Sequence, residues 1–185
     1  MMEVRFLTKE ELEVGLPAIR QSPKDEGELQ LIVRRPAVDA RELLTQAELD
    51  TVVGLVGDTW KERRSSRTED GSPHPDMQLN IINTRAIALI SPDETRQPLA
   101  GDQLFLDLDL SKENLPAGTR LALGTAVIEV TAQPHTGCKK FVERFGVEAM
   151  KFVNSPVGRE LCLRGINARV LQSGVIRVGD RAKKL

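Results

Sequence analysis

The sequence predicts a mainly β protein built from short, closely spaced strands, a barrel or a sandwich with a few short helices. Two observations carry this prediction. From Met77 onward, aliphatic and β-branched runs are separated by turn-forming residues at short intervals. In one of these runs, Leu104, Leu106, Leu108 and Leu110 recur at every second position, which is the period of a strand with one buried face.

The first third of the chain predicts two helices and one strand. Thr8–Glu11 has the pattern of a helix capping box, and Leu12, Leu16 and Ile19 follow at helical spacing until a Ser-Pro pair ends it. A strand is predicted over residues 29–33. A second capping-box pattern at 45–48 precedes four apolar residues at i, i+3, i+4 and i+7, which predicts an amphipathic helix; they are Leu49, Val52, Val53 and Val56.

Residues 61–76 predict a long surface loop, because basic residues lead into a Gly and two Pro residues that prevent regular structure. Loops of this length inside a compact domain are often functional, so this loop is a candidate lid or binding loop. Its first part could bind a phosphate, although a charge run is more commonly a solvated face. The residues concerned are Arg63, Arg64, Ser65, Ser66 and Arg67.

Further strands are predicted in the remainder of the chain, over residues 85–90, 103–110, 121–123, 125–131, 168–171 and 175–178. Asp107 and Asp109 alternate with buried leucines and are explained by a solvent-facing side of their strand. Cys162 alternates with apolar neighbours over residues 160–163, which predicts a core residue on a strand.

Composition excludes several classes of function. The chain has 185 residues, enough for one domain with a substantial core, and its formal net charge is -1, which gives no field for nucleic acid or an anionic membrane. Aromatic residues make up only 3%, too few for a base-stacking surface. The N-terminal residues lack a signal-peptide pattern and no stretch is long and apolar enough to span a bilayer, so a cytoplasmic protein is expected.

Cys138 is the main candidate for covalent or metal chemistry. It lies between a predicted strand over 127–131 and a helix-like segment over 141–145. Backbone N–H groups at such a junction, together with His135, Lys139 and Lys140, favour the thiolate form, which attacks sulfur or binds a metal. The alternative is a small buried hydrophobe without reactivity.

The two cysteines and two histidines allow two further pairings. Cys138 and Cys162 could form a disulfide, but a reducing compartment favours free thiols. The four residues together could bind zinc, but only His135 and Cys138 have the short spacing that structural zinc sites use twice. His74 is expected to be a solvated loop residue.

Three ordered blocks in the second half of the chain resemble the MOSC domain, the family named after the C-terminal domain of molybdenum-cofactor sulfurase. Gly101–Leu104 looks like its Gly-Glu-Asn-Leu element, and Pro116–Thr131 followed by Pro134–Cys138 looks like its central hairpin and cysteine. Arg164–Val170, followed by Gly179 and Asp180, looks like its closing element. The chain departs from the family pattern at Asp102, Gln103 and Gly137, where Glu, Asn and Pro are common.

The resemblance implies a β-barrel with short peripheral helices over residues 45–185, with residues 1–44 as an N-terminal extension packed on the barrel in one globular unit. It also implies that Cys138 carries sulfur or ligates the molybdenum of a pterin cofactor, with His135 as a second catalytic residue. Asp76 and Asn80 lie in the region of expected cofactor contacts. The residues expected to bind the molybdenum cofactor are Gln78, Arg85, Asp102, Gln103, Thr136, Lys139, Arg164 and Asn167.

Arg164 has an equally weighted structural interpretation, as the partner of a carboxylate inside the barrel mouth. A domain of this kind would obtain sulfur from a pyridoxal-phosphate-dependent cysteine desulfurase or electrons from a separate redox partner. Two alternative functions remain open. One is a non-catalytic module that binds a small anion or a protein through the 61–76 loop, and the other is a thiol hydrolase that uses Cys138 and His135.

Overall fold

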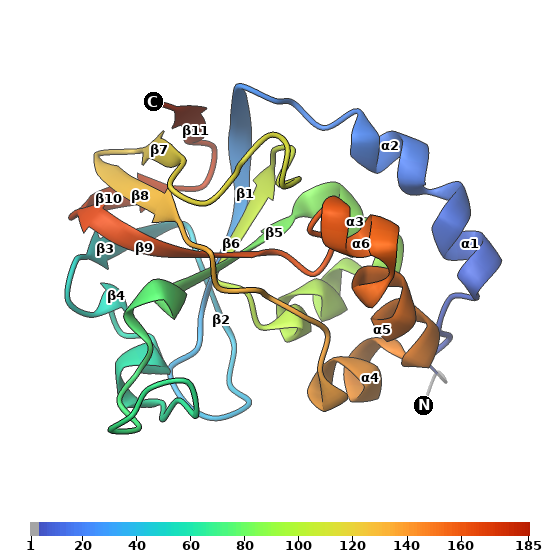
Figure 1. Ribbon diagram of the computed structural model, residues 1–185, viewed down its shortest axis with the longest axis horizontal. Coiled ribbons are helices and arrows are strands. Elements are labelled where there is room, and N and C mark those ends of the chain that lie inside the picture. The colour runs from blue at the N-terminus through green and yellow to red at the C-terminus, as the bar shows by residue number, and fades with distance from the viewer. Residues whose placement is uncertain (1–3) are drawn as a thin grey trace.

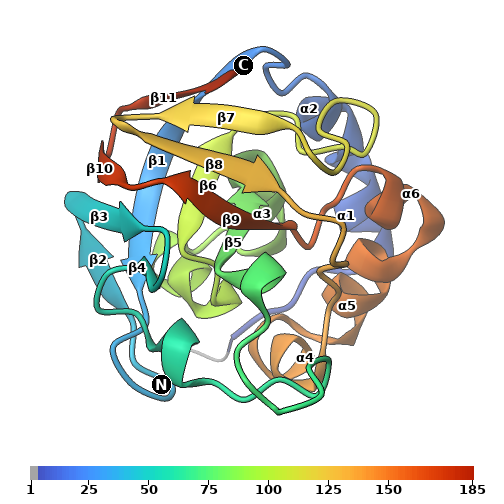
Figure 2. The same cartoon turned by 60° about the vertical axis from the view of Figure 1, so that its left-hand side comes forward.

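A closed ring of seven strands forms the centre of the computed structural model, which describes residues 4–185 (Figure 1, Figure 2). The ring closes because the last strand pairs with the first, and all neighbours are antiparallel except β5 and β6. In order around the ring, the strands are β11 (Arg181–Lys184), β7 (Arg120–Leu123), β8 (Ala126–Val130), β9 (Ile166–Gln172), β5 (Leu79–Asn83), β6 (Leu104–Asp107) and β1 (Glu26–Arg34). This confirms the predicted barrel.

Shorter strands extend the barrel on one side. β2 (Glu42–Leu44) pairs with the end of β1, and β10 (Gly174–Arg177), β3 (Gln46–Asp50) and β4 (Gly54–Leu55) form a separate three-stranded sheet. Both β1 and β2 come from the segment 1–44 that the sequence assigns to an extension. This segment therefore contributes strands to the barrel itself.

The alternation of side chains along β6 separates two hydrophobic cores. Leu104 and Leu106 point into the barrel, where they pack with Leu29 and Ile128 in the larger cluster. Phe105 points outward into a second cluster between the barrel and the helices. The predicted period of two is thus confirmed, although the regular strand ends at Asp107.

Six short helices gather along one side of the barrel in Figure 1 and cover the second core. They are α1 (Lys9–Val14), α2 (Leu16–Arg20), α3 (Thr84–Ile90), α4 (Lys139–Phe145), α5 (Val147–Asn154) and α6 (Pro156–Glu160). Three 3₁₀ helices are η1 (Thr59–Glu62), η2 (Pro75–Met77) and η3 (Glu94–Ala100). Within residues 4–185, none of the helices has the length and apolarity required to cross a bilayer.

Several predicted elements are confirmed. The capping box at Thr8 and Glu11 starts α1, with both reciprocal hydrogen bonds formed. The strand at 29–33 lies within β1, and the later strands correspond to β7, β8, β9 and β10. The segment 141–145 is helical within α4, and residues between η1 and η2 form an irregular surface loop as predicted.

The amphipathic helix predicted after residue 45 is wrong. Residues 46–55 instead form the β3–β4 hairpin, and β3 pairs along its length with β10. Alternating Ala47 and Leu49 face inward in this strand. Gly54 has a φ of 73°, a left-handed conformation that a helix excludes and a tight turn uses. Tertiary pairing therefore overrides the local helical spacing.

The strand predicted over residues 85–90 is also wrong, because this segment forms α3. Asn83 begins the helix: its side-chain oxygen accepts hydrogen bonds from the N–H groups of Arg85 and Ala86 at 2.8 and 3.1 Å. Ala86, Ile87 and Ile90 then share the buried face. A short apolar run is compatible with a helix or a strand, and here the N-terminal cap from Asn83 favours the helix.

The strand predicted over residues 160–163 is not formed: Glu160 ends α6, and residues 161–163 lie in a turn. Leu161 and Leu163 both pack into the helix-side core, and Cys162 between them has a φ of 51°. Cys162 is half-buried against the barrel core, so its packing role is confirmed while its expected place on a strand is not.

Candidate functional site

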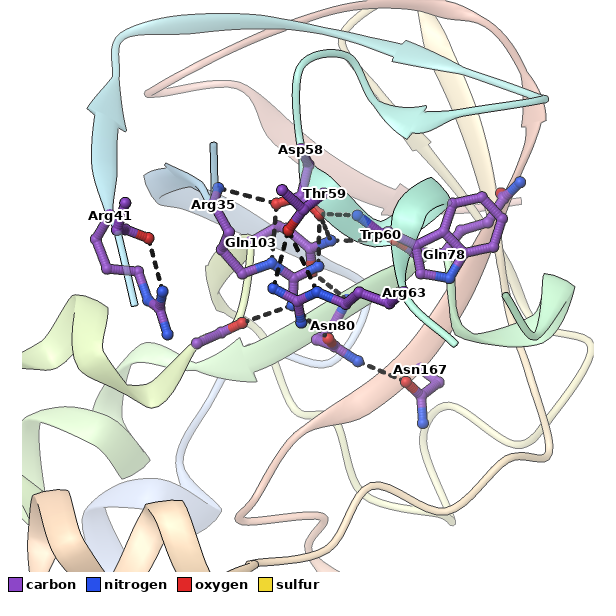
Figure 3. Close-up of polar contacts among 12 residues, drawn as sticks. Arg35, Arg41, Asp58, Thr59, Trp60, Arg63, Gln78, Asn80, Gln103 and Asn167 are labelled. Carbon is purple, nitrogen blue, oxygen red and sulfur yellow. Dashed lines mark hydrogen bonds and ion pairs between the residues drawn. The ribbon is translucent and has the colours of Figure 1, made fainter. Parts of the chain in front are cut away.

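An ion pair between Arg35 and Asp58 lies at the centre of a polar cluster at one end of the barrel (Figure 3). Arg35 directly follows β1, and its guanidinium donates to both carboxylate oxygens of Asp58 at 2.8 and 2.7 Å. Burial would raise the pKa of Asp58, but hydrogen bonds from Arg35 and its positive charge hold that pKa below its ordinary value. Arg35 also donates to Asn80 at 3.1 Å and to the Gly101 carbonyl at 3.0 Å.

A chain of amide groups continues from Arg35 across the barrel end. Asn80 on β5 and Asn167 on β9 are directly opposed in the strand register, and Asn80 Nδ2 donates to Asn167 Oδ1 at 2.6 Å. Asn167 then donates to the Gln133 carbonyl at 3.0 Å. Gln133 accepts from Arg67 of the surface loop at 3.0 Å. The loop, two strands and the segment before Cys138 are thus held together.

Gln78 and Gln103 are buried supports of this cluster. Gln78 bonds to the backbone of Thr51 and Val170, while Gln103 accepts from the N–H of Asn80 at 2.7 Å and donates to the Gln78 carbonyl at 3.1 Å. Their amide groups are already engaged by the protein. Both residues position the strands that carry the more accessible polar groups.

Two further arginines face the buried pair without a carboxylate partner within residues 4–185. Arg63 bonds to Thr59, and Arg41 bonds to the Pro98 carbonyl. Desolvation, reinforced by the positive charges of Arg35 and Arg41, lowers the pKa of Arg63 to about 10. The pKa of Arg41 is lowered by desolvation and by the neighbouring Arg144 and Arg35. Both side chains remain cations at neutral pH.

Arg35, Arg41 and Arg63 form an arginine group, and Arg35 and Arg63 of this group line a small cavity of about 140 Å³. No Asp or Glu is among the described residues that line it. The cavity lining is Arg35, Trp60, Arg63, Arg64, Ser65, Pro73, His74, Met77 and Asn80. Guanidinium, hydroxyl and amide donors of this kind match an anion with several oxygens.

His135, Asp102 and Arg164 form a second buried group. Arg164 Nη1 donates to Asp102 Oδ2 at 2.7 Å, and His135 Nδ1 lies 3.5 Å from Asp102 Oδ1. Burial lowers the pKa of His135 well below its ordinary value, and the charges of Arg164, Arg35 and Arg67 lower it further. Burial also raises the pKa of Asp102, against the effect of Arg164. His135 is therefore a neutral imidazole at neutral pH.

Cys138 is exposed at the residue that precedes α4. The Asn154 amide fixes the peptide before it, because its oxygen accepts from the N–H of Gly137 at 2.9 Å and its nitrogen donates to the Gly137 carbonyl at 3.2 Å. At the other end of α4, Arg144 bonds to Asp39 at 3.0 Å and lies close enough to Arg41 to affect its pKa. The thiol thus belongs to a segment that Asn154 of α5 holds in place, while the opposite end of α4 lies near Arg41.

The predicted site residues separate into two sets. Thr136 and Lys139 are exposed beside Cys138, and Asp102, Gln103, Gln78, Arg164 and Asn167 lie in the buried polar clusters beneath. Arg85 is placed elsewhere: it lies on α3, where it pairs with Asp107 at 2.7 Å and bonds to the Ala18 carbonyl. Asp107 is accordingly half-buried in an ion pair.

Some predicted interactions have no counterpart among residues 4–185. No hydrogen bond joins His135 to Cys138, and both cysteines are free thiols. No three His, Cys, Asp or Glu side chains in this part of the chain gather as metal ligands. The exposure of Cys138 also shows that the interpretation of this residue as a buried hydrophobe is wrong.

Arg35 and Arg41 were not predicted from the sequence as site residues. Asp58 was not predicted as the ion-pair partner of Arg35. The available signal was an arginine between the end of a predicted strand and a proline, a position where a side chain faces the barrel end. Nothing in the local sequence indicates that residues 35 and 58 meet. Their pairing depends on the return of the chain through β3 and β4.

Comparisons with known proteins agree with this fold. The chain matches the structure of the YuaD protein from Bacillus subtilis with a TM-score of 0.60 and 17% identity, over 85% of this chain and 94% of that chain. It matches YiiM from Escherichia coli (TM-score 0.56, 19% identity, 85% and 69% coverage) and YiiM from Geobacillus stearothermophilus (TM-score 0.58, 16% identity, 86% and 75% coverage). No curated protein sequence gives a significant match.

The sequence itself provides the family assignment. The family model described as the MOSC domain matches residues 76–183, which extend from the η2 segment through β11 and include the barrel strands β5 to β9, Asp102, His135 and Cys138. This match spans more than half of the chain. The chain therefore belongs to the MOSC domain family.

Proposed function

We propose that this protein binds a molybdenum–pterin cofactor, with the phosphate of the pterin held by the arginine group and the thiolate of Cys138 as a ligand of the metal. The observation that carries the proposal is the excess of positive charge around the small cavity. Arg41 and Arg63 have cationic neighbours and no carboxylate partner within residues 4–185, so a bound phosphate would relieve the repulsion between them.

The donors present fit such a cofactor. Arg63, Arg64 and Ser65 offer N–H and O–H groups to phosphate oxygens at the cavity. Cys138 offers a soft sulfur ligand on an exposed, fixed segment, and thiolate suits molybdenum better than oxygen ligands alone. When bound, the cofactor would supply two-electron redox or oxygen-atom chemistry, with electrons from a separate redox partner.

The chain's own residues have distinct parts in this proposal. The Arg35–Asp58 pair and the Asn80–Asn167 bond fix the barrel end to which the cofactor binds. Asn154 fixes the backbone before Cys138. Asp102 faces Nδ1 of His135, which leaves the neutral ring able to accept a hydrogen bond at its other nitrogen.

Sulfur carriage is a second candidate, favoured by the exposure of Cys138 to a protein partner. In this case the Cys138 thiolate attacks the outer sulfur of a persulfide on a pyridoxal-phosphate-dependent cysteine desulfurase. The sulfur–sulfur bond of the donor breaks, the donor cysteine leaves as a thiolate, and Cys138 becomes the persulfide. No external oxidant is required, because the sulfane sulfur is transferred at constant overall oxidation state.

The test is metal and pterin analysis of protein from a molybdenum-replete host. We expect molybdenum and pterin to co-purify with the wild type and with Cys162→Ser, to be lost in Cys138→Ser, and to fall in occupancy in Arg63→Gln. Arg20→Gln, an exposed charge change on α2, is the matched control. Absence of both components from the wild type would overturn cofactor binding. Persulfide formation at Cys138 with a desulfurase and cysteine, absent in Cys138→Ser, would then support sulfur carriage.

A further inference from the structure

A second and larger cavity, of about 460 Å³, lies where the segment after β8, the 111–118 loop and the turn before β9 meet. Its volume is within the range of small-molecule sites. It has a different lining from the arginine cavity: His74, Arg35 and Arg63 are absent from it, and Cys162 is part of it. The cofactor proposal uses one residue of this lining, His135, and assigns no role to the rest of the cavity.

The wall of the larger cavity is mainly apolar. Leu115, Val130, Val153 and Ile166 contribute to it, and all four are at least 94% buried members of the two cores. Such side chains form a fixed surface that would contact an apolar body of a ligand without rearrangement. The cavity is therefore present before any ligand binds.

The charged side chains that line the cavity are both positive. Lys112 and Arg159 line it, and neither takes part in an ion pair with another residue in the range 4–185. No Asp or Glu of the described chain is part of the lining. Asp109 and Glu160 are nearby: Asp109 acts on Cys162 electrostatically, and the Glu160 carbonyl accepts from the N–H of Lys112 at 3.0 Å.

His135 connects this cavity to the buried polar group. Its Nδ1 is shielded from solvent and lies 3.5 Å from Asp102, so the accessible remainder of the ring faces the cavity that it lines. His135 makes no hydrogen bond within the described residues. It can therefore offer one polar contact to a ligand in an otherwise apolar wall.

We propose that this cavity binds a small carboxylic acid with an apolar body, with the body against Leu115, Val130 and Ile166 and the carboxylate toward Lys112 and Arg159. The apolar lining supplies most of the affinity, and the two unpaired cations select an acid over its neutral analogue. This site is independent of the cofactor proposed at the arginine cavity. Its test therefore uses protein without cofactor.

The first experiment compares two probes by calorimetric titration, 4-phenylbutyrate and its neutral analogue 4-phenylbutanamide. We expect the acid to bind more tightly than the amide. Replacement of both cations, Lys112→Gln with Arg159→Gln, should weaken acid binding about tenfold and leave amide binding unchanged. The matched control changes two exposed cations outside the cavity, Lys24→Gln with Arg20→Gln, and should leave both affinities unchanged.

The second experiment tests whether the probe binds in this cavity. Ala117 is an exposed residue of the cavity lining, so Ala117→Trp should fill the opening and abolish binding of both probes without disturbing the core. In Cys138→Ser, Cys162 is the sole thiol, and 4-phenylbutyrate should slow its reaction with a disulfide reagent.

The proposal would be overturned by absence of saturable acid binding to the wild type. Equal weakening of acid and amide by the double substitution would remove the assigned role of Lys112 and Arg159. Binding that persists unchanged in Ala117→Trp, with no protection of Cys162, would place the probe elsewhere and refute the site. None of these outcomes depends on the molybdenum content, so the two proposals can fail separately.

Discussion

His135 shows how one buried side chain makes the stability of this protein depend on pH. The ring lies beside Asp102 and within the field of Arg164, Arg35 and Arg67. Burial and these three cations disfavour the imidazolium, while the unfolded chain titrates near the ordinary pKa of about 6.5. Below that pH the unfolded state binds a proton that the folded state does not.

Because only the unfolded state binds this proton, the stability of the protein should fall with pH. As pH falls from about 7.5 through 6.5, the free energy of unfolding should decrease, with a limiting slope of about 1.4 kcal/mol per pH unit for one proton. His135→Gln should reduce this slope, whereas Arg20→Gln, an exposed change on α2, should retain it. Denaturant unfolding at several pH values measures both. An unchanged slope in His135→Gln would show that the ring is protonated as readily in the folded protein as in water.

At the scale of elements, the sequence correctly predicted the segments whose local helix or strand preference agrees with their tertiary contacts. The capping box before α1 and the alternating leucines of β6 are both confirmed. Residues 46–55 and 85–90 were assigned to the wrong state because their apolar spacing suits either structure. Pairing of β3 with β10 decides the first, and the side-chain cap from Asn83 decides the second.

Close contact between β1 and the end of β6 gives the next prediction. A Cβ atom on Gly27 would lie 2.8 Å from both the Asp107 carbonyl carbon and Leu108 Cβ, and the backbone there cannot yield easily. Gly27→Ala should therefore lower the free energy of unfolding by about 1–3 kcal/mol. Gly15→Ala is the control, because its new methyl would meet only the flexible side chain of Leu89. Equal stability of the two variants by urea unfolding would contradict the close approach.

At the scale of the whole molecule, only some of the site residues could be predicted from the sequence. Cys138, His135 and Asn167 were identified because they lie in short blocks that resemble a family. Arg35 and Asp58 were not, because they meet only after β1, β3 and β4 are placed, and Arg85 was assigned to the site although its partner is Asp107. Long-range pairing in the barrel thus determines which charged groups share the site.

Closure of the barrel also makes the stability of the whole fold depend on its last strand, β11. β11 pairs with β1 on one side and β7 on the other, and Ala182 within it is fully buried in the barrel core. Ala182→Asp would put an unpaired carboxylate in that core and should lower the free energy of unfolding by about 3–5 kcal/mol. It should also expose the edges of β1 and β7, which favours aggregation.

The matched control is Lys183→Asn, the next residue along β11, whose side chain is exposed; its effect should stay within about 0.5 kcal/mol. Urea unfolding gives the two free energies, and light scattering detects association of the opened edges. If Ala182→Asp unfolds at the wild-type midpoint and stays monomeric, β11 does not close the barrel in solution. If instead both substitutions destabilise equally, the inward and outward faces of β11 are assigned incorrectly. The expected large difference between neighbouring positions follows only from a strand with one face in a closed core.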